Sequence, residues 1–313
     1  MSTTPEYAAE LEGGAGVHSL DHFSLTVPDL RETKIFFSTF ELDIQRRSGR
    51  LEIYAFDSGQ RWVIVSEGGK KAIGHITLGA YPDDLPKFHE RLVDTGVVLL
   101  QSSGWADGLW FRDPCGLLVE IRAADKSSPT GRASVAEPPA LSSLRAAPLR
   151  GETAAIRPRR LSHILLFTPD IGRSVAFYSK VLGLRLSDSA GPVAFLHGKH
   201  GSDHHLLAFA ESSRGIGYHH SAWEVGSISE VGLGAMQMAE RGYARGWGLG
   251  RHVLGSNYFH YVRDPWGSYS EFSCGIDYIP AGLLWTASRP DPRNSLYLWG
   301  PPPPEDFTEN YEL

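Results

Sequence analysis

The sequence lacks the features of disulfide-stabilised, membrane-spanning and nucleic-acid-binding proteins. Only two of its 313 residues are cysteines, Cys115 and Cys274, too few for a disulfide framework. No window approaches eighteen uninterrupted apolar residues, and no charged and apolar secretory leader opens the chain, so we expect no membrane span. Lys and Arg total 30 against 36 Asp and Glu, which argues against nucleic acid as a partner because phosphate binding requires a basic face. These absences predict a cytoplasmic protein.

The sequence also has no glycine-rich phosphate loop after any expected strand, which argues against a Rossmann domain. The chain exceeds the usual size of one domain, so we expect two. Residues 1–17 have no periodicity and predict a flexible N-terminal tail, whereas 125–158 is rich in Ser, Pro, Ala and Arg and predicts a linker. The remaining parts are an N-terminal module at 18–124, a C-terminal module at 159–278 and an extended tail at 279–313.

The two modules repeat the same order of segments. LDHFSLTVPDLRETKIFF, from Leu20, matches LSHILLFTPDIGRSVAFY, from Leu161, and each predicts a strand, a Pro-Asp turn and an amphipathic helix. FRDPCGLLVEI, from Phe111, matches VRDPWGSYSEF, from Val262, and each predicts an Asp-Pro-x-Gly turn that leads into a strand. Each module is therefore expected to consist of βαβ-type units with additional strands.

Each module also carries two histidines and a glutamate at similar spacing. The sets are His22, His75 and Glu120 in the first module and His163, His220 and Glu271 in the second. Each histidine lies near the start of an alternating strand. Two imidazoles and one carboxylate on one side of a metal form the facial triad of non-haem Fe(II) oxygenases, and this donor set also accepts Mn(II) or Zn(II).

From these residues, the sequence resembles the vicinal oxygen chelate superfamily over roughly residues 18–300, and within it the type I extradiol ring-cleavage dioxygenases, which are catechol 2,3-dioxygenase-like. The resemblance implies an α+β fold of two tandem modules of paired βαβββ units, the glyoxalase/bleomycin resistance/extradiol dioxygenase fold. It implies Fe(II), or Mn(II) as in some members of the family, held by His163, His220 and Glu271. His219, which precedes one of these ligands, is expected to point away from the metal, as a residue that supports a ligand or the structure.

Three further positions match active-site residues of that family. The family has a histidine fifteen residues before its second ligand, a tyrosine ten before the glutamate and a histidine nine before that tyrosine. Here these positions are His205, Tyr261 and His252. The resemblance implies that His205 is the general acid and base, and that the other two bind the substrate oxygen. It implies meta cleavage of a substituted catechol by O2 to a hydroxymuconic semialdehyde-type product, by a homo-oligomer (tetramer or dimer).

The first module is expected to be non-catalytic, because Gln60 and Trp110 stand where the second module has the histidine and the tyrosine. Its triad is interpreted as a packed remnant, with a second metal site as the alternative. Leu165 replaces an asparagine of some family members, so the substrate stays open. The tail segment SLYLWGPPPPEDF contains four consecutive prolines and predicts an extended path along the second module.

Three alternatives remain open at this point. A trihydroxybenzene could replace catechol as the substrate of the same reaction. An isomerase, epimerase or thiol transferase of the same superfamily would bind metal but usually lacks the His205, His252 and Tyr261 set. A drug-sequestering protein would need an aromatic groove and no metal. We favour the dioxygenase, with a monocyclic aromatic diol as substrate, because those three residue types coincide with the metal ligands.

Overall fold

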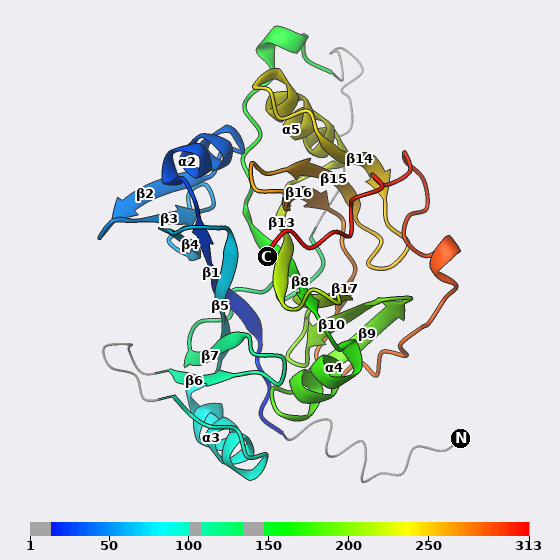
Figure 1. Cartoon of the computed structure of the whole chain (residues 1–313). Coiled ribbons are helices and arrows are strands. Elements are labelled where there is room, and N and C mark those ends of the chain that lie inside the picture. The colour runs from blue at the N-terminus through cyan, green and yellow to red at the C-terminus, as the bar shows by residue number, and fades with distance from the viewer. Residues whose placement is uncertain (1–13, 101–107, 134–146, 313) are drawn as a thin grey trace.

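The first module is a seven-stranded mixed sheet with helices on its outer side (Figure 1). The structure is a computed structural model, and it describes residues 14–100, 108–133 and 147–312. The elements of the first module are β1 (Ser19–Val27), α2 (Leu30–Thr39), β2 (Asp43–Arg47), β3 (Arg50–Tyr54), β4 (Arg61–Glu67), β5 (Ala72–Ala80), α3 (Leu85–Asp94), β6 (Leu109–Arg112) and β7 (Leu118–Ala123). The strand order is β2-β3-β4-β1-β5-β7-β6, with β1 antiparallel to β5. The outer neighbours β4 and β7 run parallel to β1 and β5 respectively.

The second module repeats this arrangement in an eight-stranded sheet. Its elements are β8 (Arg160–Thr168), α4 (Ile171–Lys180), β9 (Leu184–Ala190), β10 (Val193–Gly198), β12 (Leu207–Glu211), β13 (Gly217–Glu224), α5 (Ile228–Glu240), β14 (Gly246–Arg251), β15 (Tyr258–Arg263) and β16 (Tyr269–Cys274). The order is β14-β15-β16-β13-β8-β12-β10-β9, again with an antiparallel central pair, β8 and β13. The predicted α+β fold of two tandem modules is confirmed. Within the described residues, the second unit of the first module has two strands after its helix, β6 and β7.

The repeated turn sequences produce the same local structure in both modules. The carboxylates of Asp29 and Asp170 cap the N-termini of α2 and α4 by accepting backbone N–H groups. In the Asp-Pro-x-Gly turn of the second module, the carboxylate of Asp264 accepts two backbone N–H groups at 2.8 and 2.9 Å. The turn glycines, Gly116 and Gly267, have φ of 99° and 95°, a conformation that favours glycine because it has no Cβ.

The two modules pack against each other through aromatic side chains. Phe40, which follows α2, stacks on Phe272 of β16 with ring centroids 3.8 Å apart, and Phe23 of β1 stacks on Tyr218 of β13 at 5.3 Å. Buried side chains of both modules form one continuous hydrophobic core. The second sheet therefore packs against the first module through part of the shared core.

The C-terminal segment, residues 279–312, runs along the second module (Figure 1). Its first residues form a two-stranded sheet in which β17 (Tyr278–Ile279) pairs with β11 (Ser202–Asp203). Further along, Ser288 and Trp299 make single bridges to Asp188 and Arg251. The segment is thus joined to the second sheet at several points along its length.

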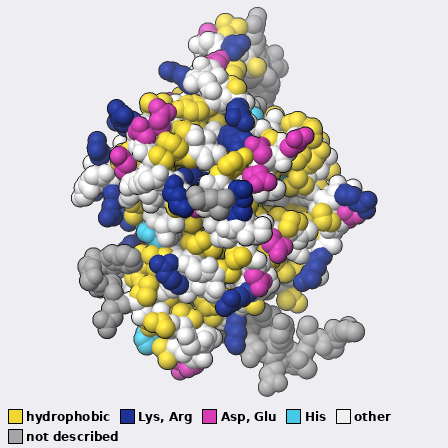
Figure 2. Space-filling model, viewed as in Figure 1, with side chains coloured by type: hydrophobic (Ala, Val, Ile, Leu, Met, Phe, Trp, Pro, Cys, Tyr) yellow, Lys and Arg dark blue, Asp and Glu magenta, His cyan; other side chains and the backbone are white. Residues whose placement is uncertain are grey.

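The boundaries of the expected tail and linker fall partly outside the described residues, which omit 1–13 and 134–146. Of the described part, Ala15 and Val17 are buried against the core. None of the helices in the described ranges has the length and apolar character needed to cross a membrane. Figure 2 shows one face of the molecule, on which Lys and Arg are interspersed with Asp, Glu and apolar side chains.

Candidate metal centre and substrate cavity

Strand register brings the three predicted ligands of the second module together. In the sheet, His163 of β8 and Glu271 of β16 both lie opposite Ala222, on the strand β13 between them. His220 precedes Ala222 by two residues, so its side chain points to the same face of that strand. The small Ala222 side chain leaves the space between the flanking imidazole and carboxylate open.

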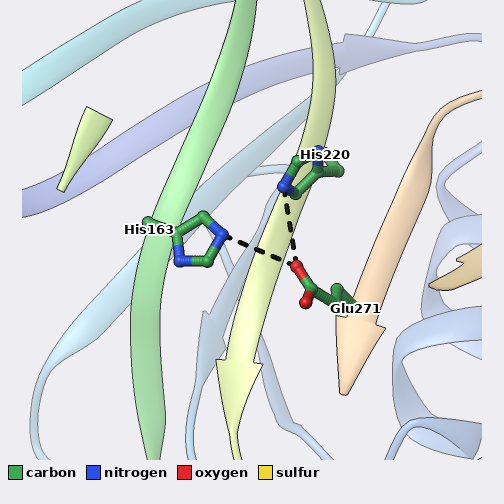
Figure 3. Close-up of side chains that lie close together, drawn as sticks. All are labelled: His163, His220 and Glu271. Atoms are coloured by element: carbon green, nitrogen blue, oxygen red, sulfur yellow. Dashed lines mark ion pairs between the residues drawn. The ribbon is translucent and has the colours of Figure 1, made fainter. Parts of the chain in front are cut away.

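The ligand atoms converge with a separation that suits one metal ion (Figure 3). Glu271 Oε2 lies 3.5 Å from His163 Nε2 and 3.6 Å from His220 Nε2. Ligand atoms about 2.0–2.2 Å from one ion lie about 3.0–3.5 Å apart at bond angles of about 90–110°. Glu271 Oε2 and His220 Nε2 are buried and have no hydrogen-bond partner. Within the described ranges, this is the one group of His, Cys, Asp and Glu side chains whose ligand atoms all lie within 4.8 Å of one another.

The protonation states suit metal binding by the imidazoles. Burial lowers the pKa of His163 to about 3, and burial together with neighbouring histidines lowers the pKa of His220 well below its ordinary value. Both rings are therefore neutral near pH 7 and offer a nitrogen lone pair. Burial raises the pKa of Glu271 to about 7, and a cation between the three groups would stabilise its charged form. Two imidazoles and a carboxylate, with Glu271 Oε2 and His220 Nε2 buried and lacking hydrogen-bond partners, fit a divalent metal.

Neighbouring polar groups orient two of the ligands. His163 Nδ1 lies 3.2 Å from Ser162 Oγ, and the Ser162 hydroxyl donates to Asp203 Oδ2 at 2.9 Å. Because that hydroxyl proton is committed to Asp203, the serine oxygen accepts the Nδ1–H of His163, and its Nε2 lone pair faces Glu271. Asn257 Nδ2 donates to the other carboxylate oxygen, Glu271 Oε1, at 3.0 Å. Such partners fix the orientation of metal ligands.

The other three predicted residues lie beside this group. His205 lies two residues before the start of β12, and its ring centroid is 4.0 Å from that of His163. Tyr261 of β15 lies opposite Glu271 in the sheet, so it belongs to the same face. His252 Nε2 and the Tyr261 hydroxyl are 2.9 Å apart. The structure therefore brings all six predicted residues together.

A cavity of about 190 Å³ opens in front of the group. Its polar lining includes His163, His205, His220, His252 and Tyr261. Its apolar lining comes from β8 to β12, from the loop between β14 and β15 and from the C-terminal segment, and consists of Leu165, Ala190, Pro192, Val193, Phe195, Ala210, Leu254, Pro292, Leu296 and Phe307. Among the residues that the structure describes, no Lys, Arg, Asp or Glu lines it. A cavity of this kind suits a small, mostly apolar molecule with a few polar atoms at one end.

In the first module, a threonine hydroxyl lies between the histidine and the glutamate that correspond to His163 and Glu271. Thr77 of β5 lies opposite both His22 and Glu120, the place that Ala222 takes in the second module. Thr77 Oγ1 donates to Glu120 Oε2 at 2.7 Å and lies 3.4 Å from His22 Nε2. His75 instead bonds to a serine of the neighbouring strand. Oε2 of the first-module carboxylate is thus engaged by a protein hydroxyl, whereas Oε2 of Glu271 has no hydrogen-bond partner.

Several polar neighbours of the site were not predicted from the sequence. Asn257, which holds the glutamate, and Asp188, which bonds to His204, contact their partners only through long-range folding, and no local pattern marks them. His219 is not among the grouped ligands, and its Nδ1 lies 2.6 Å from Nδ1 of His220, so it supports a ligand, although its ring also lines the cavity. The local signal in the sequence for His204 and His219 is that each directly precedes a predicted site histidine.

The comparisons with known proteins agree with this geometry. The family model described as Glyoxalase/Bleomycin resistance protein/Dioxygenase superfamily matches residues 160–272. Metapyrocatechase 2 of Cupriavidus necator is 46% identical over 299 residues, which cover 95% of this chain and 93% of that protein. An iron-dependent extradiol dioxygenase of Rhodococcus jostii (strain RHA1) is 32% identical over 127 residues, 36% of this chain and 42% of that protein. The crystal structure of BphC, a halotolerant catechol dioxygenase, shares the fold with a TM-score of 0.74, 21% identity and coverage of 95% of this chain and 98% of that one.

Proposed function

Because the chain belongs to the Glyoxalase/Bleomycin resistance protein/Dioxygenase superfamily, we propose that it cleaves the ring of a catechol with O2 in the extradiol (meta) position. The product would be a hydroxymuconic semialdehyde or a related compound, formed during degradation of aromatic compounds. One observation carries the proposal: His205, His252 and Tyr261 line the same cavity as His163 and His220, two of the candidate metal ligands. A protein that only binds a ligand has no need of these acid, base and hydrogen-bonding groups beside a metal.

The ion that we propose at His163, His220 and Glu271 is non-haem Fe(II), and the same donor set accepts Mn(II). One relative, from Rhodococcus jostii, is an iron-dependent extradiol dioxygenase. When bound, the ion supplies a Lewis acid for the two catechol oxygens and a path for electrons between the ring and O2. The protein supplies the three ligands on one side of the ion.

His205 is the proposed general base and acid. Burial and the neighbouring His163 lower its pKa well below the ordinary value, so its ring is neutral and able to take a proton from a catechol hydroxyl. Its Nδ1 is engaged by His204 at 3.1 Å, which leaves Nε2 for the substrate. The same nitrogen can later return the proton. Such a group typically contributes about 10²–10⁴-fold to the rate.

Tyr261 is proposed to stabilise negative charge that develops on the substrate oxygens, and His252 is proposed to position the Tyr261 hydroxyl. Burial and the Glu271 carboxylate raise the pKa of Tyr261 well above its ordinary value, so its hydroxyl keeps its proton. A hydrogen-bond donor held beside the reacting group stabilises charge as it develops. The contact of 2.9 Å between His252 Nε2 and the Tyr261 hydroxyl holds that hydroxyl on the cavity wall.

The cavity supports catechols without a charged substituent as substrates. A carboxylate side chain on the ring would be buried against residues such as Val193, Phe195 and Leu296, with no Lys or Arg in the lining. Burying an unpaired charge is costly, whereas burying a methyl group is favourable. We therefore predict that kcat/KM for a methyl-substituted catechol exceeds that for a carboxylated catechol by at least about tenfold. Equal values for the two compounds would contradict this assignment.

The function is tested by anaerobic reconstitution with Fe(II), followed by air and a panel of catechols and trihydroxybenzenes. We expect O2 uptake and a yellow product. Glu271→Ala should lose both iron and activity, whereas His205→Ala should keep iron and lose at least about 10²-fold in kcat. His75→Ala, the matched change in the first module, should keep both. Iron bound in full without O2 uptake on any diol would overturn the reaction and leave the metal site standing.

We further propose a homo-oligomer that works in the cytoplasm. Large apolar side chains of the C-terminal segment are exposed, including Leu284 at 61% and Leu298 at 62%, and a second copy could cover them. Within the described residues neither cysteine forms a disulfide, which fits a reducing compartment. Light scattering coupled to gel filtration measures the oligomeric state, and a monomer at micromolar concentration would contradict the first part.

A further inference from the structure

His205 has a chain of hydrogen bonds behind it that leads to the C-terminal segment. His205 Nδ1 lies 3.1 Å from His204 Nδ1, and His204 Nε2 lies 2.7 Å from Asp188 Oδ2. The other oxygen of Asp188 accepts from Ser288, from the backbone N–H at 2.6 Å and from the hydroxyl at 2.5 Å. His204 and Asp188 are buried, with 0% and 5% exposure, so no water competes for these bonds.

The second histidine doublet repeats this arrangement. His220 Nδ1 lies 2.6 Å from His219 Nδ1, and His219 Nε2 lies 2.6 Å from the carbonyl oxygen of Phe307. Phe307 also belongs to the C-terminal segment. In both doublets, the first histidine therefore stands between an oxygen and the Nδ1 of the second histidine.

The oxygens at the ends of these chains determine where the protons lie. A carboxylate and a carbonyl only accept hydrogen bonds, so Nε2 of His204 and of His219 must donate. A neutral imidazole has one N–H, so the Nδ1 of each of these rings is an acceptor. The Nδ1 of His205 and of His220 must then carry the proton, which leaves both Nε2 lone pairs free. Figure 3 shows the Nε2 of His220 turned toward Glu271.

The proton position of a third imidazole, that of His252, is set directly by a backbone carbonyl, with no second histidine between them. The carbonyl oxygen of Leu296, also in the C-terminal segment, lies 2.7 Å from His252 Nδ1. His252 therefore donates from Nδ1 and accepts the Tyr261 hydroxyl at Nε2. The segment from 279 to 312 thus sets the proton positions of three imidazoles around one cavity.

We propose that His204, Asp188 and His219 are positioning residues that, anchored by the C-terminal segment, hold His205 and His220 in the tautomer with the proton on Nδ1. For His205 this rests on the proposed function, because the free Nε2 is the nitrogen that exchanges a proton with the substrate. For His220 it rests only on metal binding, because the free Nε2 is the ligand atom.

The first test replaces Asp188 by Asn. An amide NH₂ facing Nε2 would turn His204 into the opposite tautomer, and His205 would then carry its proton on Nε2, where the base is needed. We expect kcat to fall by about 10²–10⁴-fold with KM for catechol and iron content unchanged, as for the wrong tautomer in a catalytic triad. Asp113→Asn is the matched control, a buried aspartate of the first module that also accepts several hydrogen bonds. It should lower the melting temperature without changing kcat.

The second test uses His219 and does not require catalysis. His219→Gln keeps an oxygen for the Nδ1–H of His220 and an NH₂ for Phe307, whereas His219→Leu removes both at similar bulk. The affinity of the apoprotein for Mn(II), measured from the EPR signal of the free ion, should fall about 10–100-fold in the Leu variant and be largely restored in the Gln variant. Wild-type affinity in a folded Leu variant would overturn the role of His219.

A third measurement reads the tautomers directly. In the wild-type apoprotein labelled with ¹⁵N-histidine, long-range ¹H–¹⁵N correlations distinguish the protonated ring nitrogen from the free one. We expect Nδ1–H for both His205 and His220, and Nε2–H in either ring would overturn the proposal for that ring. If wild-type protein cleaved no catechol, the proposed function would fail, while the Mn(II) and NMR results would still decide the positioning role.

Discussion

At the scale of single residues, Tyr261 offers a change that separates chemistry from metal binding. Tyr261→Phe removes the hydroxyl that bonds to His252 and keeps the ring that packs on Trp247 at a centroid distance of 5.5 Å. We expect kcat to fall by about 10²–10³-fold, as for the loss of one preorganised donor. Iron content should stay at the wild-type level, because Tyr261 is not a ligand. Oxygen uptake and metal analysis on the same sample check both, and an unchanged kcat would remove Tyr261 from the mechanism.

The residues that could be predicted from the sequence are those with a repeated spacing or a fixed position after a turn. His163, His220 and Glu271 recur at matching places in both modules, and the structure brings them together. Asp188 and Asn257 could not be predicted, because their partners lie at long range and aspartate or asparagine in a strand or loop has many ordinary roles. The candidate metal ligands can therefore be predicted from the sequence, whereas the residues that orient the site side chains through hydrogen bonds cannot.

At the scale of strands, the two modules differ in the residue that lies between the histidine and the glutamate: Ala222 in the second module and Thr77 in the first. Ala222→Thr would place a hydroxyl beside Glu271, as Thr77 does beside Glu120. We expect iron affinity to fall by at least about tenfold, because the carboxylate would accept that hydroxyl instead of binding the ion. Ala222→Val adds the same bulk without the hydroxyl and should weaken binding less. Equal losses in the two variants, measured by metal titration of the apoprotein, would show that bulk alone is responsible.

The strands and helices themselves were predictable where turn chemistry marks them. Pro-Asp and Asp-Pro-x-Gly segments gave the starts of α2 and α4 and of the strands that carry the glutamates. The register was not predictable, because bulges shift the pairing of β1 with β5 and of β8 with β13. A one-residue shift exchanges the faces of a strand, so the opposition of Ala222 to both ligands required the three-dimensional structure.

At the scale of the whole molecule, buried neutral histidines make stability depend on pH. Burial lowers the pKa of His18 to about 4 and that of His197 to about 3, against an ordinary value of 6.5. Between pH 6.5 and about 4 the unfolded chain therefore binds protons at these positions and the folded protein does not. Stability is present above pH 6.5 and is lost as the pH falls through this window, by roughly 1.4 kcal/mol per pH unit for each proton taken up on unfolding.

The share of these two histidines in the dependence can be measured by substitution, because both bond to groups that an amide can also reach. His18 Nε2 bonds to the Ala124 carbonyl oxygen, and His197 Nδ1 lies 2.7 Å from Ser187 Oγ. In the double variant His18→Asn and His197→Asn, the unfolding free energy from urea titrations at pH 7, 6 and 5 should fall less steeply than in wild type. The difference should approach two protons per molecule in the middle of the window. An unchanged slope would mean that other groups, such as paired carboxylates, control the acid sensitivity of the fold.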